Sequence, residues 1–261
     1  MGQLAQATAG QQLQPLNTMS DMHQLIASHR KQIESVMSGA LTADRLYSLL
    51  QSAVSREPKL LQCTPESIVA CCMKCSTLGL EPSSVDGLGK AYILPYGNKN
   101  LASGRPEATF ILGYKGMLDL ARRSGELKSI TVTAAFQGDG IELMMGEDGE
   151  PRLKDMPINL DASHDPENLR FVFLCAKFTN GGSHSEYMTK SEIDAVRARS
   201  KAGNTGPWKS DYVAMAKKTI IRRSFPYLPI DTQAQKAAVA DETTPAYGFL
   251  TRPADNSIEG E

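Results

Sequence analysis

The segment from residue 200 to residue 229 constrains the fold most, because it joins a glycine-rich turn to a strongly basic helical run. The turn SKAGNTGPW, at residues 200–208, leads directly into DYVAMAKKTIIRRSF, at residues 211–225, and Pro226 follows. The segment carries six basic residues and one acid, Asp211, although the formal net charge of the whole chain is −1. These parts favour a loop and a helix that bind a polyanion.

The run at residues 211–225 has chemically different sides when it is placed on a helix at about 100° per residue. One side is a narrow apolar stripe made of Val213, Ala216 and Ile220. The other sides carry four cations, which are Lys217, Lys218, Arg222 and Arg223. A solvated charged face would usually interleave Glu with Lys at i,i+4, whereas this run has no acid between Tyr212 and Leu228. The pattern therefore favours nucleic-acid phosphate as the counter-charge, with binding that weakens steeply with salt.

The composition is that of an ordinary globular protein, with its charge segregated along the sequence. The chain has 261 residues, of which 41% are hydrophobic and 22% charged, and this predicts either one large domain or one domain plus tails. Residues 142–167 carry eight acids against two basic residues, and residues 230–261 carry six against two. A basic region with acidic segments elsewhere favours head-to-tail contacts between subunits.

Membrane insertion and secretion are not indicated by the sequence. No run approaches the roughly 18 to 20 apolar residues of a membrane span, and the N-terminus has neither a basic nor an apolar signal region. Five cysteines, three of them in CCMKC at residues 71–75, are typical of a reducing compartment. Their helical context predicts buried core thiols, because no second ligand pair follows at zinc spacing. We expect a soluble, cytoplasmic protein without a metal site.

The N-terminal third has the periodicity of helices. Residues 1–18 lack periodicity and are expected to form a disordered leader. Helical patterns follow at residues 20–36, 42–57 and 64–79, with Thr42 and Thr64 as N-caps and Gly79 as a left-handed C-terminal residue. We therefore predict a helical part over residues 19–80.

Residues 81–229 have the mixed pattern of an α+β core. Strands are expected at residues 91–96, 108–114, 129–137, 140–145, 169–178 and 184–188, the first two forming a hairpin. Helices are expected at residues 115–124, 191–199 with Ser191 as N-cap, and 211–225. We therefore predict an α+β fold, in which helices pack on an antiparallel sheet and form a basic groove. An acidic, flexible tail is expected at residues 230–261.

Catalytic and cofactor motifs are incomplete. The nearest approach to a P-loop, GLGKA at residues 87–91, lacks the first glycine at the right spacing and the Ser or Thr that would hold Mg²⁺. A nuclease could use Asp119, Glu126 and Lys128 around a metal, but helical ion pairs with the arginines three and four residues later explain Asp119 better. The four histidines are scattered without a catalytic spacing. We predict that the chain is not an enzyme and needs no cofactor.

A second basic helix is expected within YKGMLDLARRSG, at residues 114–125. Its apolar positions lie on one side, while Lys115, Arg122 and Arg123 point largely outward. Two cationic helices in one α+β core could line a single groove.

Several blocks of the sequence resemble the RecT family of phage and prophage single-strand annealing proteins. The resemblance covers roughly residues 42–229 and rests on these blocks, in this order: CTPESIV and LGLEP, GKAYILPYGNKN, LGYKGMLDLARRSG, SKAGNTGPW, and MAKKTIIRRSFPYLP. The Gly-Pro-Trp unit before a basic helix is also similar, more distantly, to the Red beta protein of phage lambda. The acidic segment 142–167 and the tail after Pro229 match the family pattern poorly.

The resemblance implies an ATP-independent protein that coats single-stranded DNA and pairs it with a complementary strand inside a ring-like or helical homo-oligomer. It further implies two partners, a phage 5′-to-3′ exonuclease and the host single-strand-binding protein, and a place in the cytoplasm of the bacterial host cell. The protein would have to grip phosphates while base edges stay free for the second strand. A passive single-stranded-DNA-binding protein and a metal-dependent DNase are the alternatives.

The resemblance also indicates which residues bind DNA. The residues that match the family's basic motif, and that would bind phosphate, are Lys217, Lys218, Arg222 and Arg223. Further candidates, for which salt bridges are the alternative, are Lys115, Arg122 and Arg123. Lys201 and Asn204 could hold phosphate together with backbone N–H groups, or could close the loop. Trp208 could stack on a base, whereas a lone tryptophan is more often a packing anchor.

Overall fold

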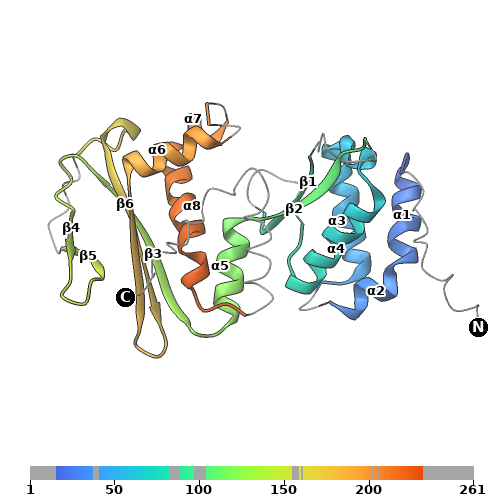
Figure 1. Cartoon of the computed structure of the whole chain (residues 1–261), viewed down its shortest axis with the longest axis horizontal. Coiled ribbons are helices and arrows are strands. Elements are labelled where there is room, and N and C mark those ends of the chain that lie inside the picture. Colours follow the sequence, from blue (N-terminus) through green and yellow to red (C-terminus); the bar gives the residue numbers. More distant parts are fainter. Residues whose placement is uncertain are drawn as a thin grey trace, which may run out of the picture. The chain divides into compact units, whose positions relative to one another are not determined.

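The computed structural model describes residues 16–37, 41–82, 89–96, 104–154, 159, 161–200, 203–204 and 206–231. Its contacts divide the chain into two compact units, Met1–Gly113 and Tyr114–Glu261, whose elements are labelled in Figure 1. The change in sequence character predicts a boundary near residue 81, whereas the contacts place it after Gly113. Most of the predicted leader and of the predicted tail lies outside the described residues.

The first unit contains the predicted helical part. Its helices are α1 (Met19–Ser28), α2 (Arg30–Ser35), α3 (Ala43–Arg56), the 3-10 helix η1 (Pro58–Gln62) and α4 (Pro65–Leu78). Thr42 caps α3 through its side chain, and Gly79 ends α4 in the left-handed conformation with φ 57°. Thr64 is the N-cap of α4 by position, but its side chain makes no capping hydrogen bond.

Two details of the first helices differ from the sequence prediction. The helix expected over residues 20–36 is interrupted at His29, which separates α1 from α2. There the Ser28 hydroxyl and the His29 ring both contact the carbonyl oxygen of Leu25, at 2.8 and 2.9 Å, and so compete with the backbone ladder. Thr18, expected in the leader, is the N-cap of α1 in a capping box with Asp21.

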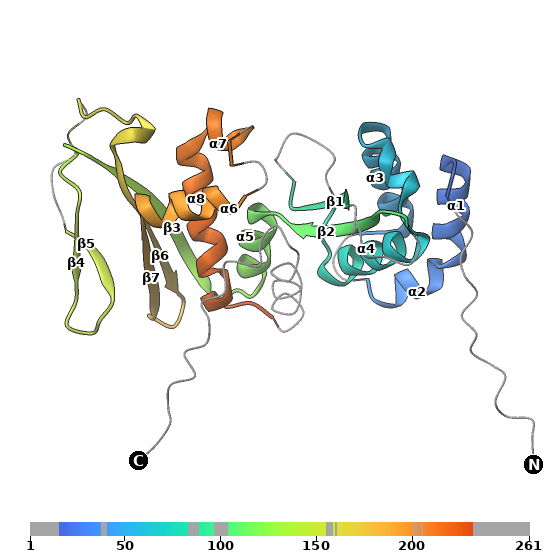
Figure 2. The ribbon, with the colours of Figure 1, turned by 45° about the horizontal axis from the view of Figure 1, so that its top comes forward.

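The predicted hairpin is present and belongs to the helical unit. Strands β1 (Ala91–Tyr96) and β2 (Glu107–Leu112) pair antiparallel, and both views place them beside α4 (Figures 1 and 2). The backbone N–H of Thr64 donates to the carbonyl of Pro106 at 3.0 Å. Next to it, the N–H of Ala108 donates to the Ser67 hydroxyl oxygen at 2.9 Å. These bonds explain why the contact boundary follows the hairpin.

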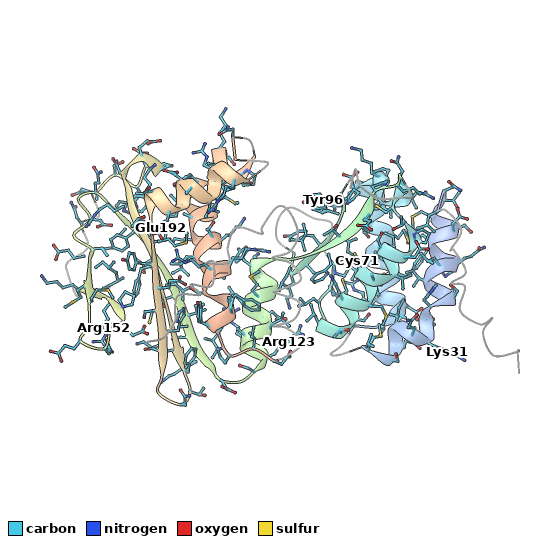
Figure 3. The ribbon with its side chains drawn as sticks, in the orientation of Figure 1. Lys31, Cys71, Tyr96, Arg123, Arg152 and Glu192 are labelled. Carbon is cyan, nitrogen blue, oxygen red and sulfur yellow. The ribbon has the colours of Figure 1, made fainter. Side chains whose placement is uncertain are left out.

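The cysteines of the first unit are core residues, as predicted. Those that are buried there are Cys63, Cys71, Cys72 and Cys75. Cys71, labelled on α4 in Figure 3, donates its thiol hydrogen to the carbonyl of Ala108 at 3.4 Å. Burial raises the pKa of Cys63 to about 11 and that of Cys71 to about 12. Both groups therefore stay protonated and unreactive near neutral pH.

The second unit is built on a three-stranded antiparallel sheet in the order β3-β6-β7. Its strands are β3 (Leu127–Phe136), β6 (Leu169–Phe178) and β7 (Ser183–Thr189). A separate antiparallel hairpin consists of β4 (Glu142–Met145) and β5 (Pro151–Lys154). The sequence does not predict β5, because PRLK is too short and too polar to show an alternating pattern. The architecture confirms the predicted α+β class.

The helices of the second unit cover one face of this sheet. They are α5 (Tyr114–Arg123), α6 (Lys190–Arg199), α7 (Pro207–Ser210) and α8 (Tyr212–Ser224), and the 3-10 helices are η2 (Pro166–Asn168) and η3 (Phe225–Tyr227). Figures 1 and 2 show the β4–β5 hairpin on the opposite side of the sheet. The N-cap of α6 is Thr189 and not Ser191, because Thr189 forms a capping box with Glu192.

The central strand β6 is buried on both faces. Phe171 and Phe173 form an apolar cluster with Leu143 and Leu153 of the β4–β5 hairpin. The alternate residues of β6 point to the helical face, and those that are fully buried are Val172, Leu174 and Ala176. The sheet therefore gives α5, α6 and α8 a rigid apolar support. In the described part of the chain, no helix is long and apolar enough to cross a membrane.

Candidate nucleic-acid interface

Helix α8, which carries the basic motif, is anchored by a wider buried face than the sequence predicts. Its buried residues are Tyr212, Ala216, Thr219, Ile220, Ile221 and Ser224. Val213, expected in the stripe, is only partly buried. The Tyr212 hydroxyl donates to Asp194 of α6 at 2.6 Å. The N-terminal end of α8 is thereby tied to α6 as well as to the sheet.

Asp194 holds several groups together at this anchor. Its other carboxylate oxygen lies 2.8 Å from Nζ of Lys190, whose ammonium also lies 5.5 Å from the centre of the Tyr212 ring. Burial acts to raise the pKa of the Asp194 carboxyl, but the hydrogen bonds from Lys190 and Tyr212 outweigh it and lower the pKa below the usual value. Burial, and then the bond to Asp194, raise the pKa of Tyr212 well above its usual value. The pair is therefore a neutral phenol bonded to a carboxylate.

Trp208 is a packing residue in this structure. The residue is 4% exposed, and its ring lies 5.9 Å from that of Tyr212 in a tilted arrangement. A ring with so little exposed surface cannot receive a base on its face without a rearrangement. The burial therefore favours the packing role over base stacking.

The glycine-rich turn is held closed by Arg197 of α6. The Nε–H of Arg197 donates to the carbonyl of Gly203 at 2.7 Å, and its guanidinium lies 5.7 Å from the centre of the Tyr212 ring. A Cβ on Gly203 would lie 2.2 Å from the Arg197 carbonyl oxygen, so only glycine fits there. Asn204 is exposed on the turn, and Lys201 lies outside the described residues.

Arg223 differs from Lys217 and Lys218, because two carboxylates contact its guanidinium. Its Nε lies 2.6 Å from Oε1 of Glu186 on β7, and its Nη1 lies 3.1 Å from Oε1 of Glu192 on α6. Figure 3 labels Glu192 at the start of α6. Glu186 also accepts a hydrogen bond from the Ser224 hydroxyl at 2.6 Å. Arg223 therefore links α8 to both β7 and α6, which is a structural role.

The middle of α8 carries two lysines, Lys217 and Lys218, whose surroundings differ from those of Arg223. Nζ of Lys218 lies 5.5 Å from the centre of the Tyr114 ring on α5 and 3.9 Å from the sulfur of Met215. Within the described residues, neither Lys217 nor Lys218 forms an ion pair with a carboxylate. Both are partly buried, as is Arg222. The ammonium groups of Lys217 and Lys218 are therefore available to bind an external anion.

Helix α5 adds cations beside α8, since the two helices lie side by side in both views (Figures 1 and 2). Lys115 is partly buried and Arg122 is exposed. Arg123, labelled in Figure 3, lies with its Nη2 2.5 Å from Oδ2 of Asp119. The sequence alternative of a helical ion pair thus holds for Arg123. This ion pair also gives a structural role to Asp119, which a nuclease would instead use to bind a metal ion.

The acidic residues that hold the basic helix α8 in place are not predicted from the sequence. Glu186, Glu192 and Asp194 fix Arg223 and Tyr212, although they lie in other elements of the unit. A capping-box pattern, Thr189 followed three residues later by Glu192, is the one local signal among them. Among the described residues, no group of three or more His, Cys, Asp or Glu side chains could hold a metal ion.

The fold and this surface define an α+β protein with two adjoining cationic helices, α5 and α8. The chain matches the model of the RecT family over residues 44–255. Protein RecT of Escherichia coli (strain K12) is 38% identical over 231 residues, which cover 88% of this chain and 82% of that protein. The uncharacterized protein YqaK of Bacillus subtilis (strain 168) is 28% identical over 228 residues, covering 87% and 73%.

The chain therefore belongs to the RecT family of single-strand annealing recombinases. Members of this family bind single-stranded DNA and anneal strands without covalent catalysis. The family assignment confirms the resemblance, the activity and the non-enzymatic class that the sequence predicts.

Proposed function

We propose that α5 and α8 together form the surface that grips the phosphates of single-stranded DNA, with Lys217 and Lys218 as its centre. The observation that carries this proposal is the contrast within α8. Arg223 is neutralised by Glu186 and Glu192, whereas the two lysines face no carboxylate among the described residues. Lys115, Arg122 and Arg222 would extend the surface along the two helices, and Asn204 would extend it at the turn.

Sequence-neutral phosphate contacts suit annealing, because they leave the base edges exposed to a second strand. A single strand held in an extended form has also lost its own hairpins, which otherwise slow pairing. The side-by-side packing of α5 and α8 on a rigid sheet would hold the cations in a fixed row. Lys201, which lies outside the described residues, stays a predicted member of the surface.

The test compares a lysine pair in α8 with a matched lysine elsewhere. Lys217→Ala/Lys218→Ala should weaken binding to all sequences and reduce the slope of log Kd against log salt by about 1.4, since each phosphate contact to a single strand contributes about 0.7. Lys31→Ala, an exposed lysine of α2 labelled in Figure 3, changes charge in the other unit and should leave the slope unchanged. An unchanged slope in the double variant, with its fold intact, would contradict the proposed surface.

Annealing itself is measured with two complementary oligonucleotides in the absence of ATP. The wild type should accelerate duplex formation, and the double variant should lose most of this acceleration. Blocked pairing would indicate a passive coat, and shortened strands in Mg²⁺ would indicate a nuclease.

The assembly and its partners form a second part of the proposal. We infer a homo-oligomer, ring-like or helical, in which neighbouring chains continue the DNA-binding surface along one strand. The segregation of acids into residues 142–167 supports contacts with a basic neighbour. A phage 5′-to-3′ exonuclease and the host single-strand-binding protein would be partners in the cytoplasm of the bacterial host. Electron microscopy with sequentially added strands and co-purification with each candidate partner test these points.

A further inference from the structure

Tyr227 exposes an aromatic ring directly after the basic helix. Among the described residues, the exposed large apolar side chains are Leu94, Met144, Met145 and Tyr227, and Tyr227 is both the most exposed and the only aromatic one. Its residue exposure is 66%. The neighbouring Phe225 is 1% exposed, so the turn η3 buries one ring and presents the other.

The exposed ring is held in place from one side. The ring of His184 on β7 stacks on that of Tyr227, with 5.1 Å between centroids and 22° between planes. Nε2 of His184 lies 3.8 Å from Oε2 of Glu186, the carboxylate that also binds Arg223 and Ser224. Pro226 precedes Tyr227 and restricts the backbone of the turn. One face of the phenol is thus supported, while most of the side chain stays open to solvent.

The position of the ring connects it to the phosphate-binding surface. Tyr227 follows the last turn of α8, which contains Arg222 of the proposed surface. A strand that runs along the cations of α8 would bring its bases past the end of the helix. An aromatic ring at such a place offers a stacking surface that every base can use, since each base has a π-face.

We propose that Tyr227, backed by His184, is a stacking platform for one nucleobase of the bound single strand. This inference rests on the proposed function, because it needs the strand to lie along α8. Stacking occupies the face of a base and leaves its Watson–Crick edge free. The platform therefore holds a base without blocking its pairing with a second strand.

The test uses two oligonucleotides of equal length, one of deoxythymidine and one built entirely of abasic sites, so that only the bases differ. Tyr227→Ala should weaken binding to the thymidine strand about tenfold and leave binding to the abasic strand unchanged. Tyr227→Phe should bind both strands like the wild type, because the ring is kept. The salt slope should be the same in all three proteins, since no phosphate contact is lost.

The outcomes separate this inference from the proposed function. The stacking role is overturned if Tyr227→Ala loses the same affinity for both strands, or loses none for either, in an assay in which the wild type binds. Equal loss in the presence of a lower oligomeric state would instead place Tyr227 at a contact between copies of the chain. Failure of the proposed function has another signature, because Lys217→Ala/Lys218→Ala would then keep its affinity for both strands. The melting temperature of Tyr227→Ala, measured alongside, should stay near that of the wild type because the ring is mostly exposed.

Discussion

The Nε atom of Arg223 lies 2.6 Å from Oε1 of Glu186. The two side chains are 33% and 16% exposed, so the pair is largely withdrawn from solvent. Arg223→Ala would leave the Glu186 carboxylate, among the described residues, with the Ser224 hydroxyl and the His184 ring as its side-chain partners. We expect a loss of about 2 kcal/mol in the free energy of unfolding, the scale of a hydrogen bond to a charged group, measured by urea denaturation.

Lys217→Ala is the matched control for Arg223→Ala. It removes one cation from the same helix without breaking an ion pair among the described residues, so its stability should stay within about 0.5 kcal/mol of the wild type. Affinity for single-stranded DNA should show the opposite order, with the larger loss in Lys217→Ala. If Arg223→Ala kept full stability and instead lost affinity for single-stranded DNA, Arg223 would be a phosphate ligand and not a structural link between elements.

The same carboxylate predicts a pH dependence of stability. Burial acts to raise the pKa of Glu186, but contacts with His184 and Ser224 and the charge of Arg223 outweigh it, so the pKa lies below the usual value. A carboxyl with a lowered pKa in the folded chain stabilises the fold above its unfolded pKa, about 4.3, and loses this effect as pH falls through the folded pKa. The wild type should therefore be more stable than Glu186→Gln at pH 7.

The difference between wild type and Glu186→Gln should shrink as the pH falls from about 4.3, the pKa of the unfolded carboxyl, through the lower pKa of folded Glu186, because the protonated carboxyl is then as neutral as the amide. Urea midpoints of the two proteins, measured between pH 3 and pH 7, check this. A difference that stays constant over the range would show that the charge of Glu186 has no part in stability.

Local signals in the sequence locate the helices and most strands, but not the partners of the cations. Gly79 ends α4 with a positive φ, as its position after an apolar run predicts, because such a conformation is set by the residue itself. Arg223 looks like its neighbours on a helical projection. Its partner Glu192 lies 31 residues earlier, and only the packing of α8 against α6 and β7 brings them together. Tertiary contacts thus divide a uniform basic motif into structural and accessible cations.

Trp208 illustrates the same limit in an apolar residue. Sequence reasoning leaves base stacking and packing open, and the 4% exposure of the residue favours packing. Trp208→Ala should lower the free energy of unfolding by about 3 to 5 kcal/mol, and Trp208→Phe should lower it less. Single-stranded DNA affinity of Trp208→Phe, measured under conditions where the variant is folded, should equal that of the wild type. A stable Trp208→Phe with weakened binding would restore the stacking alternative.

The turn before Trp208 gives a further prediction, because Gly203 has no room for a side chain. A methyl group there would meet the Arg197 carbonyl oxygen at 2.2 Å, so Gly203→Ala must shift the turn and break the bond from Arg197 to Gly203. We expect a loss of about 1 to 3 kcal/mol in stability, visible in the urea midpoint. Gly182→Ala is a control in another turn, where the nearest atom lies 3.1 Å away in a side chain. Equal effects of the two substitutions would contradict the close approach at Gly203.

The contact between Tyr114 and Lys218 orients one of the two central lysines of the proposed surface. The Lys218 ammonium lies 5.5 Å from the centre of the Tyr114 ring, and such a cation–π contact at a partly exposed site contributes about 0.5 to 1 kcal/mol. Tyr114→Leu keeps an apolar side chain but removes the ring, so affinity for single-stranded DNA should fall about two- to fivefold. Tyr114→Phe keeps the ring and should bind like the wild type. In a Lys218→Met background, Tyr114→Leu should have no further effect, because the side chain that it orients is absent. Fluorescence anisotropy with one labelled oligonucleotide measures the affinities of the wild type and the four variants. An undiminished effect in the Lys218→Met background would show that Tyr114 acts through something other than Lys218.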